Sequence, residues 1–119
     1  MFLVNSDVME EERYLKDVSI VNGKVSDENY PYDFHIMRDT KNPFYNLFLM
    51  LPGIRANTVH LVINDLALLL KVRVQKQYVQ LYQAKILIIT GSLPVKVKSK
   101  VFTIDYDDGI LAIHLVEES

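Results

Sequence analysis

The sequence has no cysteine and no tryptophan, and only four glycines and four prolines among its 119 residues. Without cysteine, the chain can form neither disulfide bonds nor thiolate metal sites, which fits a reducing compartment. No apolar run approaches the roughly 20 residues that a membrane-spanning helix needs. Residues 1–4 also lack the basic flank of a secretory signal. We therefore expect a cytoplasmic protein without a membrane partner.

Signatures of catalysis and of cofactor binding are missing as well. The sequence has no glycine-rich phosphate loop and no Gly-x-Ser-x-Gly motif. His35, His60 and His114 are far apart in the sequence, so solvated or hydrogen-bonded histidines are favoured over a metal-binding trio. The aspartates of residues 105–108 lack the spacing and the glutamate of a calcium loop, and are typical of a hairpin turn. We expect no enzymatic activity, no cofactor and no metal site.

The charges are segregated along the chain, although the net charge is only -2. Residues 1–40 hold nine acids and four bases, residues 41–100 one acid and nine bases, and residues 101–119 five acids and no base. The favoured interpretation is that the acidic ends fold back on the basic middle. The alternative is an acidic or nucleic-acid partner for the middle. A nucleic-acid partner is not expected, because basic and aromatic residues are not interleaved there.

Half of the residues are hydrophobic, which is enough for one ordered core in a chain of this length. From Tyr30 onward the pattern is one of short strands. Residues 59–63 and 68–74 alternate with period two and are joined by a tight turn at Asn64-Asp65. Asp108-Gly109 predicts a second hairpin. These features predict an all-β fold, an immunoglobulin-like antiparallel β-sandwich.

Further elements are predicted with less regular patterns. Strands are expected at 32–37, 46–51 and 85–90, and at 78–82 either a short strand or a helical turn.

The domain organisation follows from the point where the strand pattern begins. We predict an N-terminal arm at 1–29, a sandwich domain at 30–116 and a short acidic tail at 117–119. Within the arm, residues 8–15 could form two turns of helix, and Asn22-Gly23 predicts a hairpin between apolar residues.

The order and spacing of three motifs resemble the α-crystallin domain of small heat shock proteins. Leu51-Pro52-Gly53 ends an apolar strand and is followed, five residues later, by the alternating strand at 59–63. Leu93-Pro94 closes a later strand, and Gly109 with Leu111 matches the family's Asn-Gly-Val-Leu hairpin signature. The resemblance covers roughly residues 32–116 and implies the α-crystallin sandwich, to which the sandwich of co-chaperone CS domains is related.

Three departures from the family pattern limit what the resemblance implies. Ile104 stands where the family signature has alanine, residues 74–85 are shorter than the loop that prokaryotic-type members exchange between subunits, and no Ile-x-Ile/Val tail follows the last strand. A homodimer or small homo-oligomer is therefore expected rather than a large shell.

The function that the resemblance implies is that of an ATP-independent chaperone, a holdase. Such proteins hold unfolding clients on exposed apolar surface and so prevent aggregation. The alternative is a CS-like adaptor module that binds protein partners without holdase activity.

Candidate binding residues come from the alternation and from the resemblance. If residues 59–63 point alternate side chains inward, Val62 points outward, and Leu69 joins it in an outer apolar patch across the hairpin. A competing interpretation is that the arm covers this patch through Val18, Ile20 or Val25. The resemblance adds a groove between strand 59–63 and the last strand, at 110–115. The full candidate set is Val59, Leu61, Val62, Ile63, Leu69, Tyr78, Tyr82, Ile110, Ile113 and Leu115.

Overall fold

The structure is a computed structural model that describes residues 15–21, 24–25, 34–38 and 44–118. Its strands are β1 (Leu15–Val21), β2 (Lys24–Val25), β3 (Phe34–Arg38), β4 (Phe44–Met50), β5 (His60–Asn64), β6 (Ala67–Arg73), β7 (Ile86–Ser92), β8 (Val97–Asp107) and β9 (Ile110–Glu117). Short helical segments are η1 (Ala56–Thr58), η2 (Lys76–Tyr78) and α2 (Val79–Tyr82).

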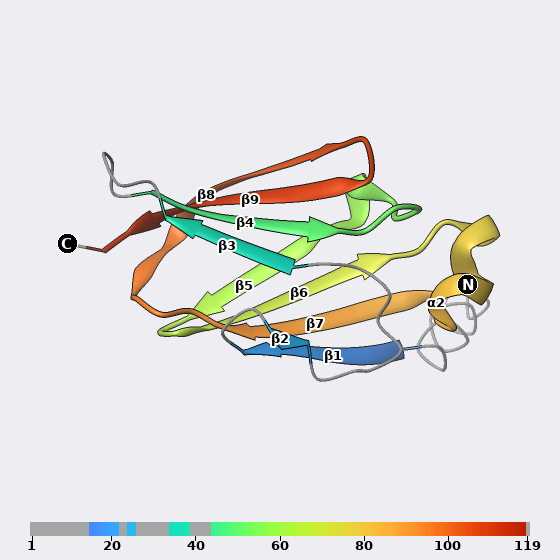
Figure 1. Ribbon diagram of the computed structural model, residues 1–119, viewed down its shortest axis with the longest axis horizontal. Coiled ribbons are helices and arrows are strands. Elements are labelled where there is room, and N and C mark those ends of the chain that lie inside the picture. The colour runs from blue at the N-terminus through green and yellow to red at the C-terminus, as the bar shows by residue number, and fades with distance from the viewer. Residues whose placement is uncertain (1–14, 22–23, 26–33, 39–43, 119) are drawn as a thin grey trace, which may run out of the picture.

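The strands form two sheets that pack face to face (Figure 1). Sheet A has five strands in the order β2-β1-β7-β6-β5, and sheet B has four in the order β3-β4-β9-β8. The all-β sandwich that the sequence predicts is confirmed. All strand pairs are antiparallel except β1 with β7, which is parallel. No helix in the described part of the chain is long and apolar enough to cross a membrane.

Alternation of apolar residues explains how β5 and β6 form. On β6, Leu68, Leu70 and Val72 are buried between the sheets, whereas Leu69 faces outward. The turn after Asn64 contains Asp65 at φ 56, a left-handed conformation that aspartate tolerates better than most residues. The predicted hairpin between these strands is confirmed.

The core lies between the two sheets and is built mainly of leucine and isoleucine. From sheet B, β4 and β9 contribute Leu47, Leu111, Ile113 and Leu115, all at 0% exposure. Burying each such side chain stabilises the fold by about 1.5–3 kcal/mol relative to leaving it in water. Among the described residues the buried side chains are all hydrophobic, and the hydroxyl of the buried Tyr82 is satisfied by a hydrogen bond to the Pro52 carbonyl.

The N-terminal stretch that the sequence assigns to an arm contributes a strand to sheet A. β1 pairs with β7 from Leu15 opposite Ile86 to Val21 opposite Ser92, and the flanks of the predicted Asn22-Gly23 hairpin pair as β1 and β2. The side chains of residues 18 and 20 lie in the core at 0% and 1% exposure. Apart from Leu15, which begins β1, the helix predicted at 8–15 lies outside the described residues.

The Leu51-Pro52-Gly53 segment at the end of β4 contacts the Asp108-Gly109 turn between β8 and β9. The amide of Leu51 donates to the carbonyl of Gly109 at 2.8 Å. Two tyrosine hydroxyls hold the same segment, because Tyr106 donates to the Leu51 carbonyl and Tyr82 to the Pro52 carbonyl, each at 2.7 Å. The end of β4 and the β8–β9 hairpin therefore form one junction.

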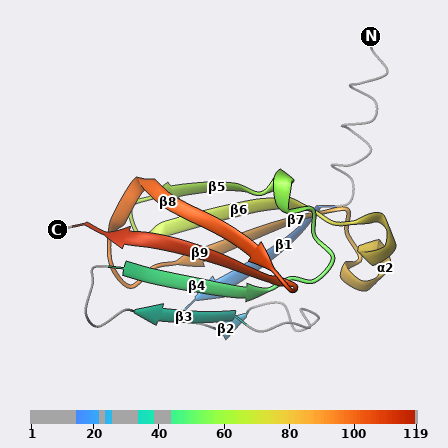
Figure 2. The same cartoon turned by 90° about the horizontal axis from the view of Figure 1, so that it is seen from above.

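Residues 78–82 are helical, so the predicted strand is wrong and the alternative, a helical turn, is correct. This turn lies at one end of the sandwich (Figure 2). Hydrogen bonds fix its approach, since the Gln75 amide donates to the Gly53 carbonyl at 2.7 Å and the Tyr78 amide to the Gln75 carbonyl at 2.9 Å. The segment ends at Gln83, whose φ of 55 stops the helix.

Candidate functional site

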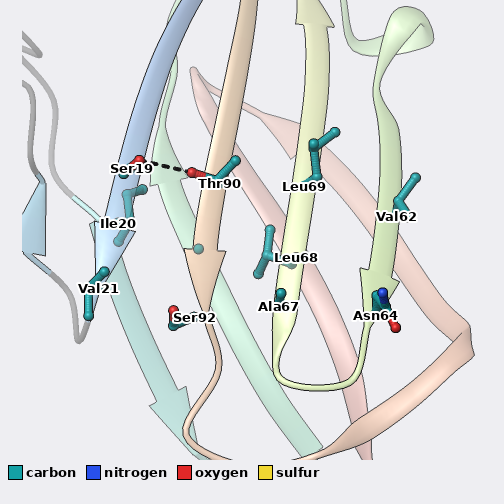
Figure 3. A pocket seen from close by; sticks show the side chains of 11 residues that line it. Ser19, Ile20, Val21, Val62, Asn64, Ala67, Leu68, Leu69, Thr90 and Ser92 are labelled. Carbon is teal, nitrogen blue, oxygen red and sulfur yellow. Dashed lines mark hydrogen bonds between the residues drawn. The ribbon is translucent and has the colours of Figure 1, made fainter.

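A groove of about 500 Å³ lies on the outer face of sheet A, across β1, β7, β6 and the β5 edge (Figure 3). Its apolar lining includes Val21, Val62, Ala67 and Leu69. None of the residues that line it is charged. Among the described residues, the groove is therefore an uncharged, largely apolar depression.

The exposed apolar pair at this groove is the one that the alternation predicts. Val62 on β5 and Leu69 on β6 are direct cross-strand partners, and their side chains are 47% and 38% exposed. Residues opposite each other on one face of a sheet have side chains in contact range, so the two form one patch. On the other side of the groove, the hydroxyls of Ser19 and Thr90 are hydrogen-bonded at 3.0 Å (Figure 3).

The suggestion that Val18 and Ile20 cover this patch is wrong, because both side chains point into the core. They belong to a strand whose outward side chains are the alternate ones, such as Val21, which is 52% exposed. Val25, the third residue of that suggestion, is half-buried and packs against the core. β1 thus borders the groove and does not cover it.

Four other candidates are buried, which corrects the expectation that they meet a partner. Ile113 and Leu115 are at 0% exposure because β9 is an interior strand with these residues facing sheet A. Tyr82 is at 1% because α2 turns it inward, and Ile63 is at 7%. None of these side chains can reach a ligand unless the core opens.

The remaining candidates are at least partly exposed. Val59, Leu61 and Tyr78 are half-buried, and Ile110 is 39% exposed at the start of β9. The groove expected between β5 and the last strand is not formed by those two strands. β9 lies between β4 and β8, and the strand of sheet B that comes near β5 is β8.

The histidines lie on separate strands. His35 on β3 and His60 on β5 are exposed, whereas His114 on β9 is half-buried. Its Nδ1 lies 2.7 Å from Asn46 Oδ1, and its Nε2 lies 3.2 Å from Asp105 Oδ2. The ring therefore links β4, β9 and β8 across the outer face of sheet B. Within the described ranges, no three His, Cys, Asp or Glu side chains are gathered in a way that could hold a metal ion.

Comparison with known proteins gives matches at the level of structure. No protein-family model and no curated protein sequence matches the chain. Heat shock protein 16.0 from Schizosaccharomyces pombe superposes with a TM-score of 0.60 at 11% identity, over 98% of this chain and 85% of that one. A Del-C4 mutant of hsp14.1 from Sulfolobus solfatataricus P2 gives 0.62 at 19% identity, over 74% and 76%. The hspA protein from Xanthomonas axonopodis gives 0.59 at 14%, over 72% and 92%.

The superpositions agree with the fold that the Leu-Pro-Gly and Asp-Gly motifs imply. Identities of 11–19% are too low to carry an activity from one protein to another, but the fold is shared along most of each chain. The chain has the α-crystallin-type fold of small heat shock proteins.

Proposed function

We propose that this protein is an ATP-independent holdase that binds unfolding proteins through the groove on the outer face of sheet A. The observation that carries the proposal is the exposed pair Val62 and Leu69 in an uncharged groove. The solved structures that share the fold are named as heat shock proteins, which supports the same class of function.

The energetics suit transient holding. Covering apolar surface contributes about 25 cal/mol per Å², so about 200–300 Å² of client surface would yield roughly 5–8 kcal/mol before ordering costs. Ordering the client segment and immobilising it offsets much of this gain. Binding at one such groove is then weak and reversible. It shields client surface from self-association without trapping the client.

The test replaces the two exposed apolar residues of the pair by lysine, in the double variant Val62→Lys with Leu69→Lys. Because these side chains are on the surface, the double variant should fold and lose most suppression of the aggregation of a heat-labile client, measured by light scattering. The matched control is Leu81→Lys with Val101→Lys, which changes two side chains that are each 50% exposed and lie outside the groove.

Equal suppression by the groove variant and the control variant would contradict the assignment of the groove. A wild-type protein that suppresses no aggregation, yet binds a folded partner, would instead favour the adaptor function.

A further inference from the structure

The outer face of sheet B carries an apolar stripe along its two interior strands, β4 and β9 (Figure 2). Every second residue of each strand is buried, so the residues between them face outward. Three of the four outward rows are apolar, and no row contains an acid, a lysine or an arginine. From the first row to the fourth, the cross-strand pairs are Phe44 with Val116, Asn46 with His114, Phe48 with Ala112 and Met50 with Ile110.

This stripe is exposed at both ends. Phe44 is 41% exposed in the first row, and Met50 and Ile110 are 43% and 39% exposed in the fourth. In the polar second row, both ring nitrogens of His114 already have partners, the row partner and a carboxylate of β8. Covering the polar row would therefore leave neither ring nitrogen unpaired, and covering the apolar rows is favourable.

β8, the edge strand beside β9, has opposite charges at its two ends. Lys98 and Lys100 are exposed near its start, and Asp107 is exposed at its end. The register with β9 shifts over the stretch that holds the lysines, which places them near the level of the first row. Asp107 is opposite Ile110 and so lies at the level of the fourth row.

A two-fold axis makes this face complementary to itself when it crosses the strands between the second and third rows. Such an axis reverses the strand direction in the second copy, and each strand lies over its equivalent. The first row then meets the fourth row of the other copy, and the second row meets the third. On β8, Lys98 and Lys100 of one copy lie over Asp107 of the other. Apolar rows thus cover apolar rows, and opposite charges meet at the rim.

We propose that two copies of this chain associate through the outer faces of sheet B, with β8 across β8 in opposite directions. The occupant is a second copy because the face matches itself both in its apolar rows and in the charges of β8. The groove of sheet A lies on the opposite side of the sandwich and stays open in such a dimer (Figure 1). The inference goes beyond the proposed function and does not depend on it.

The size of the face predicts a weak dimer. Sheet B has four strands, which lie about 4.8 Å apart, and the stripe is about 20 Å long, so the face covers roughly 400 Å² in projection. A standard interface covers about 800 Å² per partner. We therefore expect a dimer that dissociates on dilution. Its affinity should fall as salt is added, because the charges at the rim are exposed.

Charge reversal on β8 tests this arrangement, with the mass of the full chain measured by sedimentation equilibrium. Lys98→Glu with Lys100→Glu puts acids over acids at both ends of the contact, and Asp107→Lys puts bases over bases. Each variant alone should raise the dissociation constant of the dimer about tenfold at low salt. Mixed in equal amounts, the two variants should form heterodimers with close to wild-type affinity, because each contact again joins opposite charges.

Recovery on mixing also shows that both reversed variants are folded. The matched control is Lys71→Glu with Lys76→Glu, which reverses two exposed lysines that lie outside sheet B. It should leave the dissociation constant unchanged. Met50→Lys with Ile110→Lys places four charges in the contact and should abolish the dimer.

Three results would overturn the inference. One is a mixture of the reversed variants that recovers no dimer. Another is a dimer that survives Met50→Lys with Ile110→Lys and is lost with Val62→Lys and Leu69→Lys, which would place the contact on sheet A. The third is a wild-type chain that is monomeric at every concentration. If the Met50 and Ile110 variant of that monomer also lost aggregation suppression, the face would be a surface for clients.

The dimer and the holdase activity fail separately. A wild-type chain that forms this dimer but suppresses no aggregation would contradict the holdase proposal alone. A chain that suppresses aggregation through the groove and shows no recovery on mixing would contradict the dimer alone.

Discussion

Gly53 and Gly109 lie at the junction between the end of β4 and the last hairpin, and both have left-handed backbones, with φ of 77 and 78. Their surroundings differ. A Cβ on Gly53 would overlap the ring of Tyr78, whereas one on Gly109 would lie 3.4 Å from Pro52 Cβ, an ordinary contact. At Gly109 glycine is therefore required only by the left-handed backbone conformation. At Gly53 it is required both by that conformation and by the close packing of the Tyr78 ring.

Substitution to alanine should separate these two requirements. The left-handed conformation costs an L-residue roughly 1–2 kcal/mol, so Gly109→Ala should lower the free energy of unfolding by about that amount. Gly53→Ala should lower it by more, about 3 kcal/mol or above, because a ring must also move. Urea denaturation measures both. If the two variants lost the same free energy of unfolding, the Tyr78 ring would move aside at no cost, and its contact with Gly53 would not be what requires glycine at this position.

At the scale of elements, β1 decides whether the N-terminal stretch belongs to the folded sandwich. Its residue Ile20 is 1% exposed, and the adjacent Val21 is 52% exposed. We predict that Ile20→Ala lowers the free energy of unfolding by about 2–5 kcal/mol, as in other cores. Val21→Ala is the matched control and should change it by no more than about 0.5 kcal/mol. If the two variants were equally stable in urea, β1 would not be part of the cooperative fold.

Elements differ in how far the sequence predicts them. β5 and β6 could be predicted, including the exposed Val62–Leu69 pair, because period-two alternation encodes both strand and face. The pairing of β1 with β7 could not, since a strand's own alternation says nothing about its partner. At 78–82 the window is too short to separate the two periods. The burial of Tyr82 could not be predicted either, because its hydroxyl donates a hydrogen bond to the carbonyl of Pro52, which lies thirty residues away in the sequence.

The candidate groove was predictable only in part, for the same reason. Its apolar pair comes from local alternation, but its far wall comes from β1, which is distant in sequence. The prediction of a groove between β5 and β9 was wrong, because the strand order places β9 in the interior of sheet B.

At the scale of the whole molecule, both sheets expose apolar pairs. Val62 faces Leu69 on sheet A, and Met50 faces Ile110 on sheet B at 43% and 39% exposure. On β8, which is an edge strand of sheet B, Lys98 is exposed, and charged edges discourage strand-to-strand association. Self-association is therefore expected through faces more than through this edge.

We predict that the purified chain forms a dimer or small oligomer. Multi-angle light scattering at several concentrations measures the mass. Met50→Lys with Ile110→Lys should shift the population toward monomer if sheet B forms the contact, and the Val62 and Leu69 lysine variant should do so if sheet A does. A strict monomer at every concentration would contradict the prediction.

The parallel pairing of β1 with β7 also has a consequence for synthesis on the ribosome. The hydrogen-bonded hydroxyls of Ser19 and Thr90 join positions that are 71 residues apart. At roughly 5–20 residues per second, β1 waits about 4–14 s for its partner to be made. During that interval the nascent chain carries the apolar side of β1, with Val18 and Ile20, unburied. β1 is thus made long before its partner, and the nascent protein itself is for several seconds an unfolded chain of the kind that chaperones bind.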